Sequence, residues 1–590
     1  SGTMSLKTTA FADLARVRGI NVVGDVNAGA SITNSGAVTA AASNEKSDAF
    51  ARGIRVGGNL SGDVKNSGTL NMSASVKSSE SALAVGMKLN GFVSGSAVNS
   101  GTINLKASGD TTDDAEVYGF WLDNGLVKVG GAVTNSGSIT GTARATKGDA
   151  YAAGFWLQDD GTDVVDVKGS LTNSGTITIS AFGADSNSAT ATGAYIEGEI
   201  SGSFVNSGTM TLLAQGGAGS NSAYAKGLYV EDDISGTLLN SGTISVTAIE
   251  NTNFATAIGV HVDGVLSGSV TNSGTLKAVA TSGAGSVSAS GYKADSMSGT
   301  FSNTGKITAS ATGSVAANTS SYGIKFDNFD GVISNVGEIS ASGNGTNVYS
   351  IWLDAGTGTQ NSNGGTGTLN IDTSDKITGK IRVDKQDVNL DAKGERRVFS
   401  FEDASTSTGT FTTSVSGLNT AWFTKGAGGS APIYASVSTS DLGLPEGIMA
   451  DLGGMLGSIT TQLQSNFGET EAMPSLPFLE VGQSLRHFIS VDTQGLSYAS
   501  RNEGGKTDAS LRNVTIGAAG ITNAGADFAF GLGDLYGTGN NKTITDFDLN
   551  GFYLGGSVGK VFGSNYLDAG LGFGRLDSKV IRKIEGSAAA

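Results

Sequence analysis

Hydrophobic and polar residues alternate in short stretches along the first 350 or so residues, and the stretches recur at a nearly constant interval. A triplet Asn-Ser-Gly, or a close variant of it, marks each repeat, with successive asparagines 31 to 38 residues apart. The asparagines are Asn34, Asn66, Asn99, Asn135, Asn173, Asn206, Asn240, Asn272, Asn303 and Asn335. A second element keeps the same period: a glycine and three further residues, of which the first and third are mostly apolar, as in Gly119-Phe120-Trp121-Leu122.

Each repeat therefore predicts three short strands separated by Gly, Ser and Asn turns. So short a unit buries its apolar face only by stacking on its neighbours, with parallel strands about 4.8 Å apart. The predicted fold is all-β: a right-handed parallel β-helix, or solenoid, of about eleven coils and roughly 50 Å over residues 1–355. Asparagine suits the stacked turn, because its amide can bond to the amide of the next coil. Ankyrin and tetratricopeptide repeats would need a helical period that these repeats lack.

Different patterns follow the repeats. Residues 356–440 remain strand-like but irregular, and we expect them to cap the open end of the solenoid. In residues 441–470 the spacing of apolar residues predicts one helix. In residues 471–586 longer strands alternate apolar with small or polar residues, which is typical of an outer-membrane β-barrel, and about five such strands are predicted.

Composition adds three constraints. All four prolines follow residue 431, as an unbroken β ladder before them requires. The formal net charge of −16 disfavours nucleic acid as a partner. The absence of cysteine removes disulfides, thiol nucleophiles and thiolate metal sites.

The order of these parts resembles that of the monomeric (type V) autotransporters. In that family the passenger is a secreted β-helix, a cap assists its folding, and a helix threads a twelve-stranded outer-membrane barrel. The resemblance covers essentially the whole chain and rests on the order of parts. It implies a Gram-negative cell surface, with the passenger outside and the C-terminal strands in the outer membrane. Five strands cannot close such a barrel, so it also implies a barrel that is truncated or completed elsewhere.

Residues that could support catalysis are few. The histidines His261 and His487 belong to no recognisable nucleophile motif, and residues 504–507 lack the first glycine of a phosphate loop. Two acidic groups suggest calcium loops, although solvated loops are the preferred interpretation. They are Asp110, Asp113, Asp114 and Glu116, and Asp159, Asp160 and Asp163. We expect no enzyme activity, no metal and no cofactor.

The most suggestive feature is a stripe formed by the outward middle residues of the Gly-x-x-x strands. Stacked coils would place Trp121, Trp156, Tyr195, Tyr229 and His261 one above another. Such rings could hold sugars or a partner's strand, although rings that only stabilise the rod are the preferred interpretation. The other members of the stripe are Asn21, Arg55, Lys88, Lys293, Lys325 and Trp352.

Three functions stay open. The first is an adhesin or structural surface rod that contacts glycans, host cells or itself. The second is a self-assembling surface-layer or fibre protein. The third is a polysaccharide-active enzyme with Asp159, Asp160 and Asp163 as its candidate acids, because their coil has the irregular 38-residue spacing.

Overall fold

The computed structural model divides into two compact units, one built mainly from residues 1–434 and the other mainly from residues 435–586. The structure describes residues 2–438 and 486–582, with gaps in both ranges. The gaps are residues 12, 78–79, 111–113, 124–127, 159–164, 185–187, 218, 220–221, 356–366, 404–409, 418–419, 426–431, 500–505, 523, 542–544 and 563–564.

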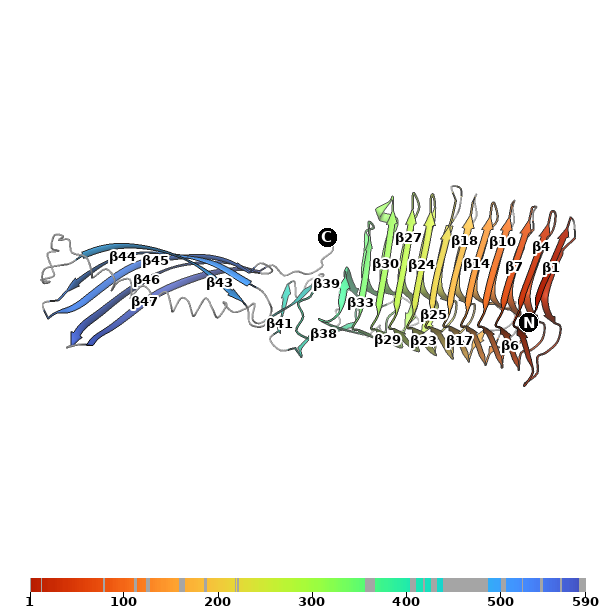
Figure 1. Cartoon of the computed structure of the whole chain (residues 1–590), viewed down its shortest axis with the longest axis horizontal. Coiled ribbons are helices and arrows are strands. Elements are labelled where there is room, and N and C mark those ends of the chain that lie inside the picture. The colour runs from red at the N-terminus through yellow and green to blue at the C-terminus, as the bar shows by residue number, and fades with distance from the viewer. Residues whose placement is uncertain are drawn as a thin grey trace. The chain divides into compact units, whose positions relative to one another are not determined.

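The first unit is a parallel β-solenoid, which confirms the predicted fold class (Figure 1). Each of the first twelve turns contributes one strand to each of three sheets, and the first ten of them end on one of the repeat asparagines. Sheet 1 holds twelve strands. They are β1 Thr3–Ala10, β4 Ala37–Asn44, β7 Thr69–Val76, β10 Thr102–Gly109, β14 Ser138–Ala145, β18 Thr176–Gly183, β21 Thr209–Gln215, β24 Thr243–Glu250, β27 Thr275–Ser282, β30 Lys306–Gly313, β33 Glu338–Gly343 and β36 Lys376–Thr378.

Sheet 2, which carries the predicted stripe, holds fifteen strands. They are β2 Ala15–Val22, β5 Ala49–Val56, β8 Ala82–Leu89, β11 Ala115–Asp123, β15 Ala150–Gln158, β19 Ala189–Ile196, β22 Ser222–Val230, β25 Phe254–Leu266, β28 Val287–Met297, β31 Thr319–Phe326, β34 Asn347–Leu353, β37 Lys380–Val383, β39 Val398–Asp403, β42 Ile433–Ser438 and β41 Thr420–Lys425.

Sheet 3 holds thirteen strands, ten of which end on an asparagine of the repeat. They are β3 Ser31–Asn34, β6 Asp63–Asn66, β9 Ser96–Asn99, β13 Ala132–Asn135, β17 Ser170–Asn173, β20 Ser203–Asn206, β23 Thr237–Asn240, β26 Ser269–Asn272, β29 Thr300–Asn303, β32 Val332–Asn335, β35 Thr368–Asp372, β38 Asp387–Ala392 and β40 Phe411–Val415. A short extra pair joins β12 Lys128–Val129 to β16 Asp166–Val167.

The core of the solenoid is made of columns of like residues, because successive turns pair in register. Ile103, Ile139 and Ile177 are partners on neighbouring strands of sheet 1, and each is 0 % exposed. Burying such a side chain contributes about 1.5–3 kcal/mol. One turn alone could not bury these residues, so stacking supplies the stability that the short strands lack.

At a column of glycines the alternation of inward and outward side chains in sheet 2 shifts by one residue, a feature that we call the bend. A Cβ atom at Gly119 would lie 2.5 Å from the carbonyl oxygen of Gly154, so only glycine fits there. In β11 both Val117 and Phe120 point into the core, three residues apart. Tyr118 and Trp121 consequently both lie on the outer face, one on each side of Gly119.

The sheets continue beyond residue 355 into the region expected to cap the solenoid. Strands β35, β38 and β40 pair in parallel, as the preceding turns do. Aromatic rings fill the core at this end: Phe401 lies 5.2 Å from Phe411 and 5.7 Å from Tyr434, between ring centroids. The predicted helix over residues 441–470 lies outside the described residues. The one helical segment that the structure does describe is the 3-10 turn η1 (Ala316–Asn318), and no described helix is long and apolar enough to cross a membrane.

The second unit contains a five-stranded antiparallel sheet, as the alternating C-terminal pattern predicts. Its strands are β43 Arg486–Ala499, β44 Lys506–Ile521, β45 Ala526–Asn541, β46 Thr545–Phe562 and β47 Asn565–Arg582. Ile516, Leu532, Leu554 and Phe573 are partners across four of these strands, and each is 53–67 % exposed. One face of this sheet therefore presents a row of large apolar side chains.

Small residues surround a buried tyrosine on the opposite face. Tyr553 is 4 % exposed and its hydroxyl bonds to the Thr515 hydroxyl. A Cβ atom at Gly533 would lie 2.3 Å from the Tyr553 ring, so this glycine makes room for the ring. The two faces of the sheet thus differ in kind, one apolar and open, the other small and polar.

Candidate binding face of the solenoid

The predicted asparagines stack into a continuous hydrogen-bonded ladder. The side-chain Nδ2 of each asparagine from Asn34 to Asn303 donates to Oδ1 of the asparagine in the next turn over 2.6–2.8 Å, and Asn335 is the last acceptor. Their side chains are at most 5 % exposed. A buried amide without a partner would cost about 1–3 kcal/mol, so this ladder fixes the register of the turns. It holds the solenoid together and offers no surface to a ligand.

The predicted stripe is also a true column. Its eleven residues are partners on neighbouring strands of sheet 2, from Asn21 through Arg55 and Lys88 to Trp352. We call Trp121, Trp156, Tyr195, Tyr229 and His261 the aromatic column. The first four are partly exposed and His261 is buried.

Four rings of the aromatic column form an unbroken stack. The Trp156 and Tyr195 ring centroids are 4.1 Å apart, those of Tyr195 and Tyr229 are 5.5 Å apart, and those of Tyr229 and His261 are 5.1 Å apart. Trp121 joins through a residue that the stripe did not include: the ring of Tyr118 lies 5.4 Å from Trp121 and 5.0 Å from Trp156. Stacking of this kind contributes about 0.5–1.5 kcal/mol per pair and holds the rings in fixed positions.

Tyr118 belongs to a small apolar cluster on the outer face, separate from the main core. Leu83, Val85 and Ala153 pack with it there, and Trp121 and Trp156 of the aromatic column lie against it. The bend at the glycine column explains why the sequence pattern missed this residue. Strict alternation would assign only one outward position near each glycine, whereas the bend provides one on each side.

A second column, which we call the acidic column, runs beside the aromatic column. It was not predicted from the sequence. It lies two residues after the aromatic column in each turn, so the same repeat spacing could have revealed it. The Tyr195 hydroxyl donates to Glu231 over 2.8 Å, and the Tyr229 hydroxyl donates to Asp263 over 2.6 Å. Its members are Asp123, Gln158, Glu197, Glu231, Asp263, Asp295, Asp327 and Asp354.

These contacts set the charge states along the face. Burial and the bonded carboxylates raise the pKa values of Tyr195 and Tyr229 above their ordinary range, so both hydroxyls stay protonated. Burial and then the charge of Lys293 lower the pKa of His261 to about 3. His261 is therefore neutral at pH 7, with Nε2 2.8 Å from an Asp263 oxygen and 3.0 Å from Lys293 Nζ.

Cations complete the face. Lys88 Nζ lies 3.3 Å from the centre of the Trp121 ring and 2.5 Å from Asp123. Lys226 Nζ lies 3.1 Å from the centre of the Tyr229 ring, and burial lowers its pKa to about 8. A face that combines flat rings with charged and hydroxyl groups can orient a polar ligand that has an apolar side.

The described members of the two acidic groups, which the sequence suggested as calcium loops or catalytic acids, form no such site. Asp114 accepts a bond from the Asp149 amide, and Glu116 accepts one from the Tyr118 hydroxyl. Burial raises the pKa of Glu116. Within the described residues, no three His, Cys, Asp or Glu side chains gather as a metal site would require. Asp113, Asp159, Asp160 and Asp163 lie outside the described residues, as do the side chain of His487 and residues 504–505.

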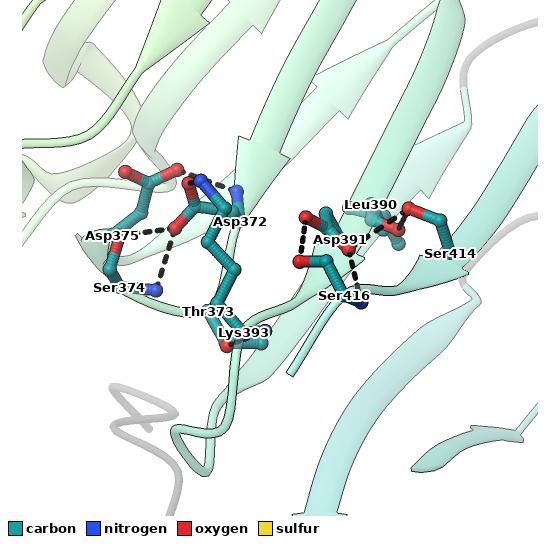
Figure 2. Close-up of polar contacts among 9 residues, drawn as sticks. All are labelled: Asp372, Thr373, Ser374, Asp375, Leu390, Asp391, Lys393, Ser414 and Ser416. Carbon is teal, nitrogen blue, oxygen red and sulfur yellow. Dashed lines mark hydrogen bonds and ion pairs between the residues drawn. The ribbon is translucent and has the colours of Figure 1, made fainter. Parts of the chain in front are cut away.

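A further polar cluster lies in the turns that follow the asparagine ladder (Figure 2). Asp372 is bonded to Lys393 over 2.6 Å and also accepts from Ser374. Asp375, which is 0 % exposed, accepts from the Asp372 amide over 2.9 Å. In the same view Asp391 accepts from the hydroxyls of Ser414 and Ser416. Lys393 and the serines thus satisfy Asp372 and Asp391, whereas one oxygen of Asp375 is buried without a hydrogen-bond partner.

Comparison with known proteins finds no matching family model, no matching curated protein and no matching solved structure.

Proposed function

We propose that the solenoid is the adhesive, carbohydrate-binding rod of a cell-surface protein of the autotransporter type, and that the aromatic column is its binding site. The observation that carries the proposal is the stack from Trp156 to His261, whose first three rings are partly exposed on one face. Flat rings suit the apolar faces of sugars, and the adjoining acidic column supplies acceptors for their hydroxyl groups. A repeated site also suits multivalent attachment, which raises avidity without new contacts.

The second unit supports an anchored location. The exposed row Ile516, Leu532, Leu554 and Phe573 would be costly in water and favourable against lipid. We propose that this sheet contacts the outer membrane of a Gram-negative bacterium and that the solenoid is extracellular.

A glycan array and a whole-cell binding assay with the full chain test the proposal. The double variant Trp156→Ala/Tyr195→Ala removes the closest pair of rings, and we expect it to bind about tenfold more weakly or worse. Phe182→Ala is the matched control, because Phe182 is an outward-facing ring on sheet 1, away from the column. Equal binding by the folded double variant and the parent would rule out the aromatic column as the site.

Self-assembly is a second candidate that one observation favours. Among the described strands, β1, β2 and β3 stand at the ends of their sheets, each paired on one side only. An open edge can pair with another chain. Filaments or ordered layers in electron micrographs of the purified chain would support this function, and a monomer at all concentrations would exclude it. The enzyme alternative depends on acids outside the described residues, and nothing in the described part of the chain favours it.

A further inference from the structure

Four arginines gather on the outer face of sheet 2 in the first two turns, directly before the aromatic column. Arg16 and Arg18 lie on β2, and Arg52 and Arg55 on β5. Arg18 and Arg52 are partners on neighbouring strands, and Lys88 follows Arg55 in register on β8. We call Arg16, Arg18, Arg52 and Arg55 the arginine cluster.

None of the four arginines forms an ion pair with a carboxylate in the described residues, although the chain as a whole carries a net charge of −16. The Nε atoms of Arg18, Arg52 and Arg55 are buried and have no hydrogen-bond partner. Burial and then the neighbouring charges of Arg16, Arg18 and Arg55 lower the pKa of Arg52 to about 10. Like charges on facing positions destabilise a sheet, so the cluster weakens the fold that carries it. An anion bound between the arginines would relieve that cost.

The arginine cluster is continuous with the aromatic column. The Arg52 guanidinium carbon lies 5.8 Å from the centre of the Trp121 ring and 5.7 Å from that of Phe50. The Trp121 Nε1 atom is buried and unpartnered, so a donor at this junction is also free. Guanidinium groups held against aromatic rings present their N–H groups edge-on, the geometry that pairs with two oxygens of one acid group.

We propose that the ligand is an acidic glycan, with its carboxylate or sulfate held by the arginine cluster and its neutral sugar rings stacked on the aromatic column. This inference rests on the function proposed above and names the class of ligand. The charges of the face fix the orientation of the glycan: its acid group lies at the arginine cluster, because the acidic column beside Tyr195 and Tyr229 would repel a negative group there. The same column disfavours a nucleic acid, whose charges are spread evenly along its length.

Titration calorimetry with the full chain tests the proposal. The probes are a tetrasaccharide that ends in a uronic acid, the same tetrasaccharide with its carboxyl group reduced to an alcohol, and a tetrasaccharide that ends in a sulfated sugar. We expect at least one acidic probe to bind about tenfold to hundredfold more tightly than the reduced probe. The preferred acid identifies the group that the cluster recognises, and added salt should weaken its binding.

Arg52→Gln/Arg55→Gln should abolish that preference, because it lowers affinity for the acidic probe far more than affinity for the reduced probe. Arg55→Gln alone, at the more exposed position, should remove part of the preference if the double variant fails to fold. The matched control is Arg144→Gln, because Arg144 lies on sheet 1, 3.9 Å from the Phe182 ring, and should have no effect.

Two results would overturn the inference and leave the proposed function standing. One is equal affinity for the acidic and reduced probes, and the other is an acid preference that survives Arg52→Gln/Arg55→Gln. A duplex oligonucleotide that displaces the acidic probe at equal concentration would also overturn it. Failure of every probe to bind would instead count against the proposed function itself.

Discussion

The side-chain nitrogen of Asn335, the last asparagine of the ladder, donates to the carbonyl oxygen of Gly337 over 3.3 Å. In the turn that follows, Ile371 occupies the position in register with Asn335, so no further amide is available. The carboxylate of Asp375 lies close to Asn335, is buried and has one oxygen without a hydrogen-bond partner. The ladder therefore ends beside a group that changes charge near neutral pH, since burial raises the Asp375 pKa to about 7.

We expect Asp375 to make the solenoid less stable as pH rises from about 4 to 7. In this window the folded protein keeps a proton that the unfolded chain, with a carboxyl pKa near 3.8, has released. The free energy of unfolding therefore falls with increasing pH. Thermal melts of Asp375→Asn should lack this decline, because an amide does not titrate. Asp391→Asn is the control and should keep the parent's slope; an unchanged slope in Asp375→Asn would contradict the prediction.

His261 should have the opposite effect on stability. Its pKa is about 3 in the folded protein against 6.5 for an ordinary histidine, so between those values only the unfolded chain binds the proton. The free energy of unfolding contributed by this group is constant above pH 6.5 and falls as the solution is acidified. Compared with the parent, His261→Gln should be relatively more stable at pH 4.5 than at pH 7.5. A histidine ring signal that titrates near pH 6.5 and is assigned to His261 would disprove this.

Breaking the ladder in its middle should destabilise the solenoid strongly. Asn206→Ala leaves the Asn173 donor and the Asn240 acceptor buried without partners, at a combined cost of about 2–5 kcal/mol. Chemical denaturation followed by circular dichroism measures the change. Asn104→Ala is the matched control, because its bond to Asn71 lies on the outer face of sheet 1, and its loss should cost less than about 1 kcal/mol. Similar losses in the two variants would show that burial of the ladder is unimportant.

The glycine column should not tolerate a methyl group. In Gly154→Ala the new Cβ would lie 2.6 Å from the Gly193 carbonyl oxygen and 2.8 Å from Ile177, which forces neighbouring turns apart. We expect a loss of about 1–3 kcal/mol or failure to fold. At Gly24 a Cβ would have no atom within 4 Å, so Gly24→Ala should change stability by less than about 0.5 kcal/mol. The bend would need another explanation if Gly154→Ala folded as stably as the parent.

The apolar row of the second unit should govern interaction with lipid if that sheet contacts a membrane. Leu554→Lys places a charge in the centre of the row and should weaken folding into lipid vesicles by about 2–4 kcal/mol. Leu554→Phe keeps the position apolar and serves as the control. Unfolding by urea in the presence of vesicles gives the difference, and equal midpoints for the two variants would argue against contact with lipid through this face.

Much of this architecture could be predicted because the repeat makes position in the sequence equivalent to position in a column. The Asn-Ser-Gly spacing alone placed Asn34 above Asn66, and the glycine spacing placed Trp121 above Trp156. Both placements follow from nearest-neighbour pairing, which needs no knowledge of distant contacts.

Features that depend on bending or on charge balance were not accessible in this way. Tyr118 reaches the outer face because of the bend at Gly119, and a simple two-residue period does not include that bend. The four arginines can be read from the sequence, but their proximity cannot. That Arg52 Nε has no hydrogen-bond partner is evident only from the positions of the surrounding side chains. The buried position of Asp375 near the end of the ladder depends on an irregular segment, where no repeat guides the placement of side chains.

Because each asparagine bonds only to the turns above and below it, the ladder permits whole turns to be removed or duplicated as interchangeable cassettes. Deleting residues 207–240 would join Asn206 to Ser241 and place Asn206 next to Asn272, with the same side-chain bond restored. A gain or loss of one cassette would change the reach of the rod by about 4.8 Å while preserving its cross-section. The length of the solenoid can therefore change without a change in how neighbouring turns are held together. Length depends on the number of turns, and stability depends on the contacts between each turn and the next.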